Sequence, residues 1–198
     1  MKLGDILSLK TMRFQDEPRE KDLKVIRQQA NLLKGFPIEY FKGNPPPKND
    51  SSKVKIELRK LSDLPHDIDF VKEMDDIDGV FRNYCDIQGL DFPESLVNQL
   101  IEDGRIFTRT LKIHYNRPRP YQLARHPLIN IDIGKEAFME SMNTPSYPSG
   151  HSCQGILIAK VMSDIYPDHE YNFMNLGRDI SRSRNIGRAH YETDSSFG

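Results

Sequence analysis

The sequence GILIAKVMSDI at residues 155–165 is the most apolar stretch of the chain, and Pro167 follows shortly after it. Proline lacks a backbone amide and clashes with the preceding helical turn, so Pro167 closes any helix formed here. The stretch therefore predicts a central buried helix, around which a helical bundle packs.

Helical periodicity continues on both sides of this stretch. Apolar residues recur every three or four positions over residues 68–85 and again over residues 96–111, which predicts two long helices. Pro118 and Pro120 must end the second of these helices. A last helix is expected from about residue 168 towards residue 184.

The N-terminal part of the chain, residues 1–60, is expected to form an extension to a helical domain of residues 61–198. Apolar spacing predicts a helix over residues 19–34, and GNPPPKNDSS at residues 43–52 is typical of a linker. Residues 53–58 alternate strictly between charged and apolar side chains, which is the period of a half-buried strand. We therefore expect a minor strand there.

Composition places the chain among folded proteins without membrane spans. Its 198 residues include 28 Lys and Arg against 29 Asp and Glu, so the formal net charge is −1. No stretch approaches the roughly 20 apolar residues that a transmembrane helix needs. The opening MKLGDILSLK carries Gly4 and Asp5 where a secretory signal has its apolar run, which favours a cytoplasmic location. Cys85 and Cys153 lie too far apart in sequence to suggest a disulfide framework or a zinc site.

Positive charge is concentrated despite the balanced total. Residues 105–131 contain no Asp or Glu but several arginines, Lys112 and two histidines, and four more arginines lie between residues 178 and 188. Such runs attract anions, whether as a solvated face, a nucleic-acid patch or a pocket.

Three short motifs decide between these possibilities. They are KIHYNRPRP at residues 112–120, PSGH at residues 148–151 and SRNIGRAHYETD at residues 183–194. As patterns they read K-x6-R-P, P-S-G-H and S-R-x5-H-x3-D. This ordered set resembles the signature of the type 2 phosphatidic acid phosphatase superfamily, which includes bacterial class A nonspecific acid phosphatases, lipid phosphatases and vanadium haloperoxidases. The resemblance implies an all-α helical bundle of the acid phosphatase and vanadium haloperoxidase type, which hydrolyses phosphate monoesters through a phosphohistidine.

The residue types also make chemical sense by themselves. A phosphoryl group in transfer spreads negative charge over its oxygens, so a catalyst without a metal needs several fixed cations and amide donors around one point. Lys112, Arg119 and Arg184 provide such cations. The amides of Ser149 and Gly150 fall at the start of the apolar helix, where backbone donors are unsatisfied. The alternative role for the Ser149 hydroxyl is solely to cap that helix.

His190 and Asp194 are four residues apart, which on a helix places the carboxylate beneath the imidazole. It can then accept the Nδ1 proton and leave Nε2 free to attack. Arg184 and His190 would diverge on an unbroken helix, so we expect a bend near Gly187. By resemblance, His190 is the nucleophile, Asp194 orients it and His151 is the general acid. The resemblance further assigns phosphate binding to Lys112, Arg119, Ser149, Gly150 and Arg184.

Other polar groups receive structural interpretations. Asp75, Asp76 and Asp78 are expected on a solvated helix face, because consecutive helical residues point in different directions and do not build a metal site. No metal or other cofactor is expected. Arg117, Arg182 and Arg188 lie beside motif positions and are expected to support the site or to be solvated. Tyr115, Tyr121 and Tyr147 either line the leaving-group pocket or pack in the core.

Two alternatives stay open at this stage. The same pocket could hold vanadate as the cofactor of a haloperoxidase, or the basic run could belong to a phosphate-binding or nucleic-acid-binding module without catalysis. A membrane lipid phosphatase is disfavoured by the missing transmembrane segments. The expected partner is a small phosphorylated substrate, held by residues 121–147 and the N-terminal third. Apolar residues of the N-terminal helix suggest a possible homo-oligomer.

Overall fold

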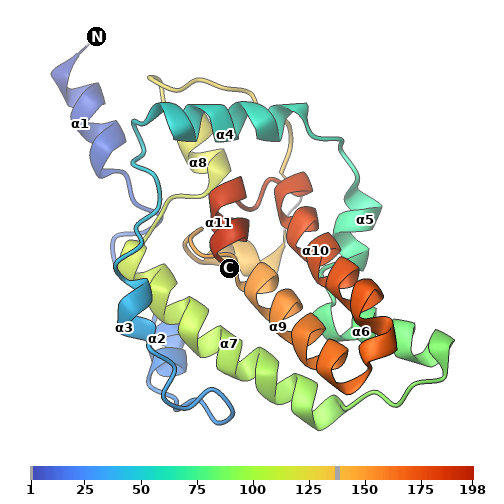
Figure 1. The fold of residues 1–198 in the computed structure, drawn as a ribbon. Helices are drawn as coiled ribbons and strands as arrows, with labels where there is room; N and C mark the ends of the chain where they lie inside the picture. Colours follow the sequence, from blue (N-terminus) through green and yellow to red (C-terminus); the bar gives the residue numbers. More distant parts are fainter. Residues whose placement is uncertain (1, 137–138) are drawn as a thin grey trace.

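The computed structural model describes residues 2–136 and 139–198, and every regular element in that part of the chain is helical (Figure 1). The predicted all-α class is therefore confirmed. The α-helices are α1 (Leu3–Thr11), α2 (Glu20–Ile26), α3 (Ile38–Phe41), α4 (Ser52–Asp63), α5 (Ile68–Glu73), α6 (Ile77–Gln88), α7 (Glu94–Tyr115), α8 (Pro120–Ala124), α9 (Gly150–Ile165), α10 (Glu170–Ile186) and α11 (Glu192–Phe197), with short 3₁₀ turns at Glu140–Asn143 and Pro167–His169.

Helix α9 is the central buried helix that the apolar stretch predicts. It packs against α10 on one side and α7 on the other (Figure 1). Its side chains Ile158, Ala159 and Met162 are fully buried. The main core cluster joins them to Met74, Ile77, Phe81, Cys85, Val97, Leu100, Phe173 and Ile180. This cluster fixes α6, α7, α9 and α10 relative to one another.

Two glycines let the backbones of α9 and α10 pack in direct contact. A Cβ atom on Gly177 would lie 2.9 Å from the Gly155 carbonyl oxygen and 3.0 Å from the Cβ of Ala159. A Cβ atom on Gly155 would lie 3.1 Å from the Cγ2 of Ile180. Since the two helices are antiparallel neighbours, the first turn of α9 meets the last turns of α10, where Ser181 Oγ lies 2.9 Å from Ser152 Oγ.

The two long helices predicted before α9 have different outcomes. Helix α7 forms as predicted and ends at Tyr115, where Asn116 takes a left-handed conformation with φ of +47°. The single helix predicted over residues 68–85 is wrong, because the chain breaks between α5 and α6. Asp76 accepts a hydrogen bond from the Gly79 amide at 3.3 Å and so starts a new helix.

The strand predicted at residues 53–58 is wrong, since these residues belong to α4. Ser51 caps this helix by accepting a hydrogen bond from the Val54 amide. Val54 and Leu58 are buried on one face, whereas Ile56 is 52% exposed on the other. The alternation misleads because residues four apart share a face in a helix as well as in a strand.

The predicted helix at residues 19–34 is shorter than expected, ending at Ile26 as α2. The Asp103 carboxylate on α7 accepts hydrogen bonds from the amides of Asn31 and Leu33, at 3.0 and 2.8 Å, so these donors are satisfied outside a helix. The division of the chain near residue 60 stays a prediction, and that residue lies within α4.

In residues 2–136 and 139–198, no helix combines the length and apolar character needed to cross a membrane. Cys85 and Cys153 are both free thiols, as the sequence predicts.

The close approach of α9 and α10 predicts a strong response to Gly177→Val. A branched side chain there must push the helices apart, which should lower the free energy of unfolding by about 1–3 kcal/mol. Urea denaturation measures this value. Gly4 in α1 has open space around it, so Gly4→Val is the control and should change stability by no more than about 0.5 kcal/mol. Equal effects of the two substitutions would contradict the proposed packing constraint.

Candidate active site

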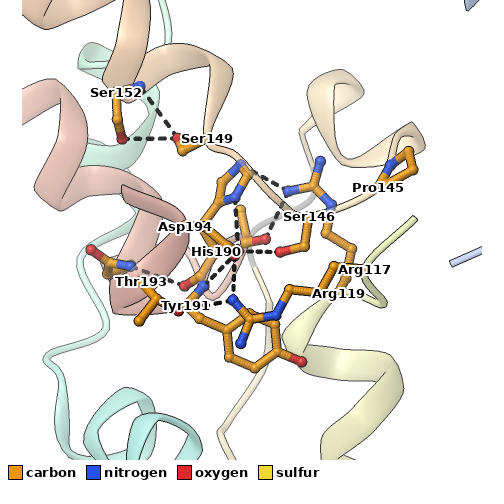
Figure 2. A network of polar contacts seen from close by, with 12 residues as sticks. Arg117, Arg119, Pro145, Ser146, Ser149, Ser152, His190, Tyr191, Thr193 and Asp194 are labelled. Carbon is orange, nitrogen blue, oxygen red and sulfur yellow. Dashed lines mark hydrogen bonds and ion pairs between the residues drawn. The ribbon is translucent and has the colours of Figure 1, made fainter. Parts of the chain in front are cut away.

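The three sequence motifs meet between the C-terminal ends of α7 and α10 and the N-terminal end of α9. Lys112 lies in the last turn of α7, Arg119 precedes α8, and PSGH opens α9. Arg184 lies in the last turn of α10. The segment between α10 and α11 carries His190, and the polar network around it is drawn in Figure 2.

His190 contacts a different charged group at each ring nitrogen. Its Nδ1 lies 3.2 Å from Asp194 Oδ2, and its Nε2 lies 2.9 Å from Arg119 Nη1. Arginine only donates hydrogen bonds, so Nε2 accepts and the proton of the neutral ring lies on Nδ1, where Asp194 accepts it. Burial lowers the pKa of His190 well below its usual range, with help from the Arg119 charge. The ring is therefore neutral at neutral pH, with its Nε2 lone pair facing the arginine.

We expected one turn of continuous helix between His190 and Asp194, and this expectation is wrong. Helix α11 begins only at Glu192, and Tyr191 is its N-cap residue. Asp194 folds back across this first turn and accepts the Tyr191 amide at 3.0 Å while it contacts the imidazole. The four-residue spacing therefore brings the pair together through a turn rather than a continuous helix.

The bend expected at Gly187 is present. Helix α10 ends at Ile186, and Arg188 takes a left-handed conformation with φ of +57°. The turn brings the amides of Ala189 and His190 back to the Arg184 carbonyl, at 3.0 and 3.3 Å. It thus returns His190 to the end of the helix that carries Arg184.

Asp194 is completely buried and ionised. It receives Arg117 Nη1 at 2.5 Å on Oδ1 and the Ser146 hydroxyl on Oδ2. Burial alone would raise the pKa of Asp194, but the Arg117 charge and the His190 contact outweigh it and hold this pKa well below its usual range. The carboxylate therefore stays available to accept the imidazole proton.

Arg117 is in turn held by a residue of α4 that lies 60 positions earlier in the sequence. Its Nη2 donates to Glu57 Oε2 at 3.2 Å, and its guanidinium lies 3.8 Å from the centre of the Tyr191 ring. Glu57 Oε1 also accepts the Thr193 amide at 2.7 Å. The dashed lines in Figure 2 follow part of this chain of contacts from Arg117 through Asp194 and His190 to Arg119. Glu57 is not among the site residues that the sequence predicts, since a single carboxylate in an amphipathic segment carries no distinguishing signal.

Lys112 and Arg119 are buried cations held mainly by carbonyl oxygens. Lys112 Nζ donates to the Pro145 carbonyl at 2.6 Å. Arg119 donates to the carbonyls of Thr144, Ala189 and Ser141 at 2.7–2.8 Å. Neither forms an ion pair with a carboxylate in the part of the chain that the structure describes. Burial lowers the pKa of Lys112 well below its usual range and that of Arg119 to about 10. An anion bound beside these two groups would offset the effect of burial and stabilise the charged form of the lysine.

The start of α9 supplies further donors. Ser149 caps the helix, because its Oγ accepts hydrogen bonds from the Ser152 amide at 3.3 Å and the Ser152 hydroxyl at 2.8 Å. The capping interpretation of this hydroxyl is therefore correct, and it is compatible with phosphate binding at the neighbouring amides. A Cβ atom on Gly150 would lie 3.6 Å from Thr108 Oγ1, an ordinary van der Waals contact, so the start of α9 packs close to α7 at this residue. Amides in the first helical turn point along the axis towards an anion placed there.

Asp75 joins the site, and the solvated face predicted for residues 75, 76 and 78 is wrong for this residue. Its Oδ1 lies 3.1 Å from His151 Nε2 and 2.5 Å from Arg184 Nη1. The break between α5 and α6 turns this carboxylate inward. Asp76 caps α6, and Asp78 pairs with Arg82 at the surface, at 3.6 Å. The contacts of Asp75 with His151 and Arg184 lower the pKa of Asp75 to about 2.

Asp75 and His151 are the most accessible of the charged residues gathered here. The side chain of Asp75 is 40% exposed and that of His151 17%, whereas Arg119, Ser149 and Arg184 are fully buried.

The remaining candidates have structural roles. Arg188 is buried and donates to the carbonyls of Ile133, Pro65 and Leu64 at 3.1, 2.9 and 2.7 Å. Arg182 is exposed. The Tyr147 hydroxyl donates to the Asn44 carbonyl, and its ring stacks on Phe197, which favours core packing for this tyrosine. Among the residues described, no group of three or more His, Cys, Asp or Glu side chains is placed to hold a metal ion.

A helical bundle with these motifs at one end defines a known class. A sequence model of the PAP2 superfamily matches residues 99–198, which is half of the chain, and the chain therefore belongs to this superfamily. The resemblance drawn from the three motifs is confirmed.

Curated relatives agree with this assignment. A non-specific acid phosphatase of Salmonella typhimurium is 33% identical over 115 residues, which cover 54% of this chain and 43% of that protein. A non-specific acid phosphatase of Providencia stuartii is 35% identical over 107 residues, 52% of this chain and 42% of the relative. An acid phosphatase of Zymomonas mobilis is 30% identical over 91 residues, 44% of this chain and 31% of the relative. The matched segments span less than half the length of these relatives.

The pairing of Arg117 with two buried carboxylates predicts a large effect of Arg117→Met. The substitution leaves Glu57 and Asp194 buried without their cation, which should cost about 3–5 kcal/mol in the free energy of unfolding. Arg125→Met is the matched control, because Arg125 pairs with Glu136 while 69% exposed and should contribute at most about 1 kcal/mol. Similar losses for both variants, measured by urea denaturation, would contradict the role of Arg117.

The lowered pKa of Asp194 predicts a loss of stability in acid. An unfolded Asp titrates near 3.9, so a folded-state pKa below this value stabilises the protein above about pH 4, and the stabilisation is lost as the pH falls through the folded pKa. The free energy of unfolding should therefore decrease as the pH is lowered from about 4 towards 2. The decrease should be shallower in Asp194→Asn, and identical slopes in the two proteins would contradict the prediction.

Proposed function

We propose that this protein hydrolyses phosphate monoesters by transferring the phosphoryl group to Nε2 of His190. The observation that carries the proposal is the orientation of this imidazole, with Nδ1 on the Asp194 carboxylate and Nε2 facing the Arg119 guanidinium. A buried, neutral imidazole with an oriented proton is a competent nucleophile once its Nε2 lone pair is released by the arginine. The cation beside that lone pair marks where the negative charge of a phosphoryl group is stabilised.

The groups around Nε2 suit a phosphate dianion. Arg119 can exchange its contact with Nε2 for a phosphate oxygen, and Arg184 adds a second guanidinium. Lys112 contributes a point charge. The amides at Ser149 and Gly150 donate from the start of α9. These side chains supply the positive charge of the proposed step, so the step requires no metal ion.

The reaction proceeds in two balanced steps. First, Nε2 of His190 attacks phosphorus, the bond from phosphorus to the ester oxygen breaks, and the His151 imidazolium gives its proton to the departing alcohol. Asp194 stabilises the imidazolium of the phosphohistidine through Nδ1. Second, the now neutral His151 takes a proton from water, whose oxygen attacks phosphorus, and the bond from phosphorus to nitrogen breaks to release phosphate.

The pH dependence follows from the two histidines. Burial and the Arg119 charge lower the pKa of His190, which favours the neutral form that the attack requires. Burial also lowers the pKa of His151, while Asp75 acts in the opposite sense. Since His151 must be protonated when the ester binds, kcat/KM should decrease as the pH rises through this pKa, which gives an acidic optimum.

Two relatives are named non-specific acid phosphatases, which supports small phosphorylated substrates without a narrow preference for one compound. A cytoplasmic location and a homo-oligomer stay predictions from the sequence.

The first test is hydrolysis of p-nitrophenyl phosphate between pH 4 and 9 in the presence of a chelator. His190→Ala removes the nucleophile and should lower kcat/KM at least about 1,000-fold, because a missing nucleophile disables the first step. His114→Ala is the matched control, since His114 is exposed on α7 and should have no effect. Vanadate should inhibit the wild-type enzyme.

Other outcomes identify the alternatives. Activity of His190→Ala close to wild type would overturn the proposed nucleophile. Bromide oxidation by peroxide with bound vanadate, without ester hydrolysis, would indicate a haloperoxidase. Binding of phosphate without turnover of either kind would indicate a binding module.

A further inference from the structure

We propose that Asp75 is a positioning residue for the general acid: it forms a second histidine–aspartate pair with His151, stabilises the protonated form of this imidazole and ties it to Arg184. The inference rests on the proposed function, because it concerns the acid that serves the leaving group.

The contacts of Asp75 are specific. A single carboxylate oxygen, Oδ1, lies 3.1 Å from His151 Nε2 and 2.5 Å from Arg184 Nη1. An ionised carboxylate only accepts hydrogen bonds, so Nε2 of His151 must carry a proton. When Nδ1 is also protonated, the resulting imidazolium has an anion beside it. Asp75 therefore does for the proposed acid what Asp194 does for the proposed nucleophile.

The local charges make this carboxylate decisive. In the described part of the chain, the charged groups that act most strongly on the His151 ring are Asp75, from the junction between α5 and α6, and Arg184, from α10. Lys112 of α7 and Arg119 act on His190 instead. Burial and the Arg184 charge both lower the pKa of His151, and Asp75 opposes them. Without Asp75 the imidazole would lie beside a buried guanidinium with no counter-charge and would lose its proton at a lower pH.

Contacts of the residues on both sides of Asp75 fix its position. Arg184 Nη2 donates to the Val71 carbonyl of α5 at 3.1 Å, and the Val71 side chain is buried. The Asp75 amide donates to the Lys72 carbonyl at 3.2 Å, and Asp76 starts α6 immediately afterwards. The junction is thus anchored on both sides of Asp75. It lies outside residues 99–198, which the superfamily match covers.

The direct test is an NMR titration of the His151 imidazole in wild type and in Asp75→Asn, which keeps the shape of the side chain. The pKa of His151 should decrease by about 1 unit or more in the variant. Asp78→Asn is the matched control, because it removes the same charge from a surface residue of α6 that pairs with Arg82. An unchanged His151 pKa in Asp75→Asn, with the fold intact by its NMR spectrum, would overturn the proposal.

Kinetics supply a readout that a purely structural role would not change. In Asp75→Asn the basic limb of kcat/KM should move to lower pH by the same amount. At pH 7 an alkyl phosphate, whose leaving group needs the proton, should lose roughly ten times more kcat/KM than p-nitrophenyl phosphate. Asp75→Glu should restore part of the difference. Equal losses for both esters would overturn the role of Asp75. A gain in kcat/KM for both esters would also overturn it, because the Asp75 carboxylate would then only compete with the phosphate for the cations.

The two proposals fail in distinguishable ways. If wild type hydrolyses no ester, the proposed function fails, while the NMR titration still measures whether Asp75 stabilises the His151 imidazolium. If wild type is active and the titration shows no shift, only the role of Asp75 fails.

Discussion

The buried carboxylate of Asp194 is the constraint on which the rest of the site depends. An unpaired charge cannot be buried without a large free-energy cost, so the chain must surround this carboxylate with donors. Arg117, Ser146, the Tyr191 amide and His190 provide them. These donors come from segments far apart in the sequence, and α4 completes the set by holding Arg117 through Glu57. The need to pair the ionised Asp194 carboxylate thus makes the orientation of the His190 imidazole depend on α4.

Helix packing brings the second half of the site within reach of the first. Because Gly155 and Gly177 allow α9 and α10 to touch, the start of α9 with His151 lies near the end of α10 with Arg184. The turn at Gly187 then returns the chain to His190. The result is two histidines at the end of one helical bundle, each in contact with a carboxylate. Arg119 contacts His190 directly, whereas Arg184 contacts the Asp75 carboxylate that also holds His151. In the proposed mechanism, one imidazole attacks phosphorus and the other transfers the proton.

The sequence predicts the parts of this arrangement that depend on local spacing. Long apolar periodicity indicates α7, α9 and α10, and the three motifs indicate which side chains gather. Contacts between distant segments leave no such signal. In the sequence, Asp75 resembles the neighbouring solvated acids, but the break between α5 and α6 turns its side chain inward. Glu57 lies in a segment whose alternation predicts a strand, but Ser51 caps a helix there. In both cases a cap residue, which periodicity does not weigh, decides the direction of the carboxylate.

The most direct test of the account is to trap the covalent intermediate. Wild-type enzyme mixed rapidly with a phosphate monoester and quenched in base should carry one phosphoryl group on the peptide that contains His190, and acid should release it, because phosphohistidine is stable in base and labile in acid. Peptide mass spectrometry locates the group. A phosphoryl group on Ser149 or another side chain, or turnover in which no phosphorylated protein is captured at any time, would contradict the central role of His190.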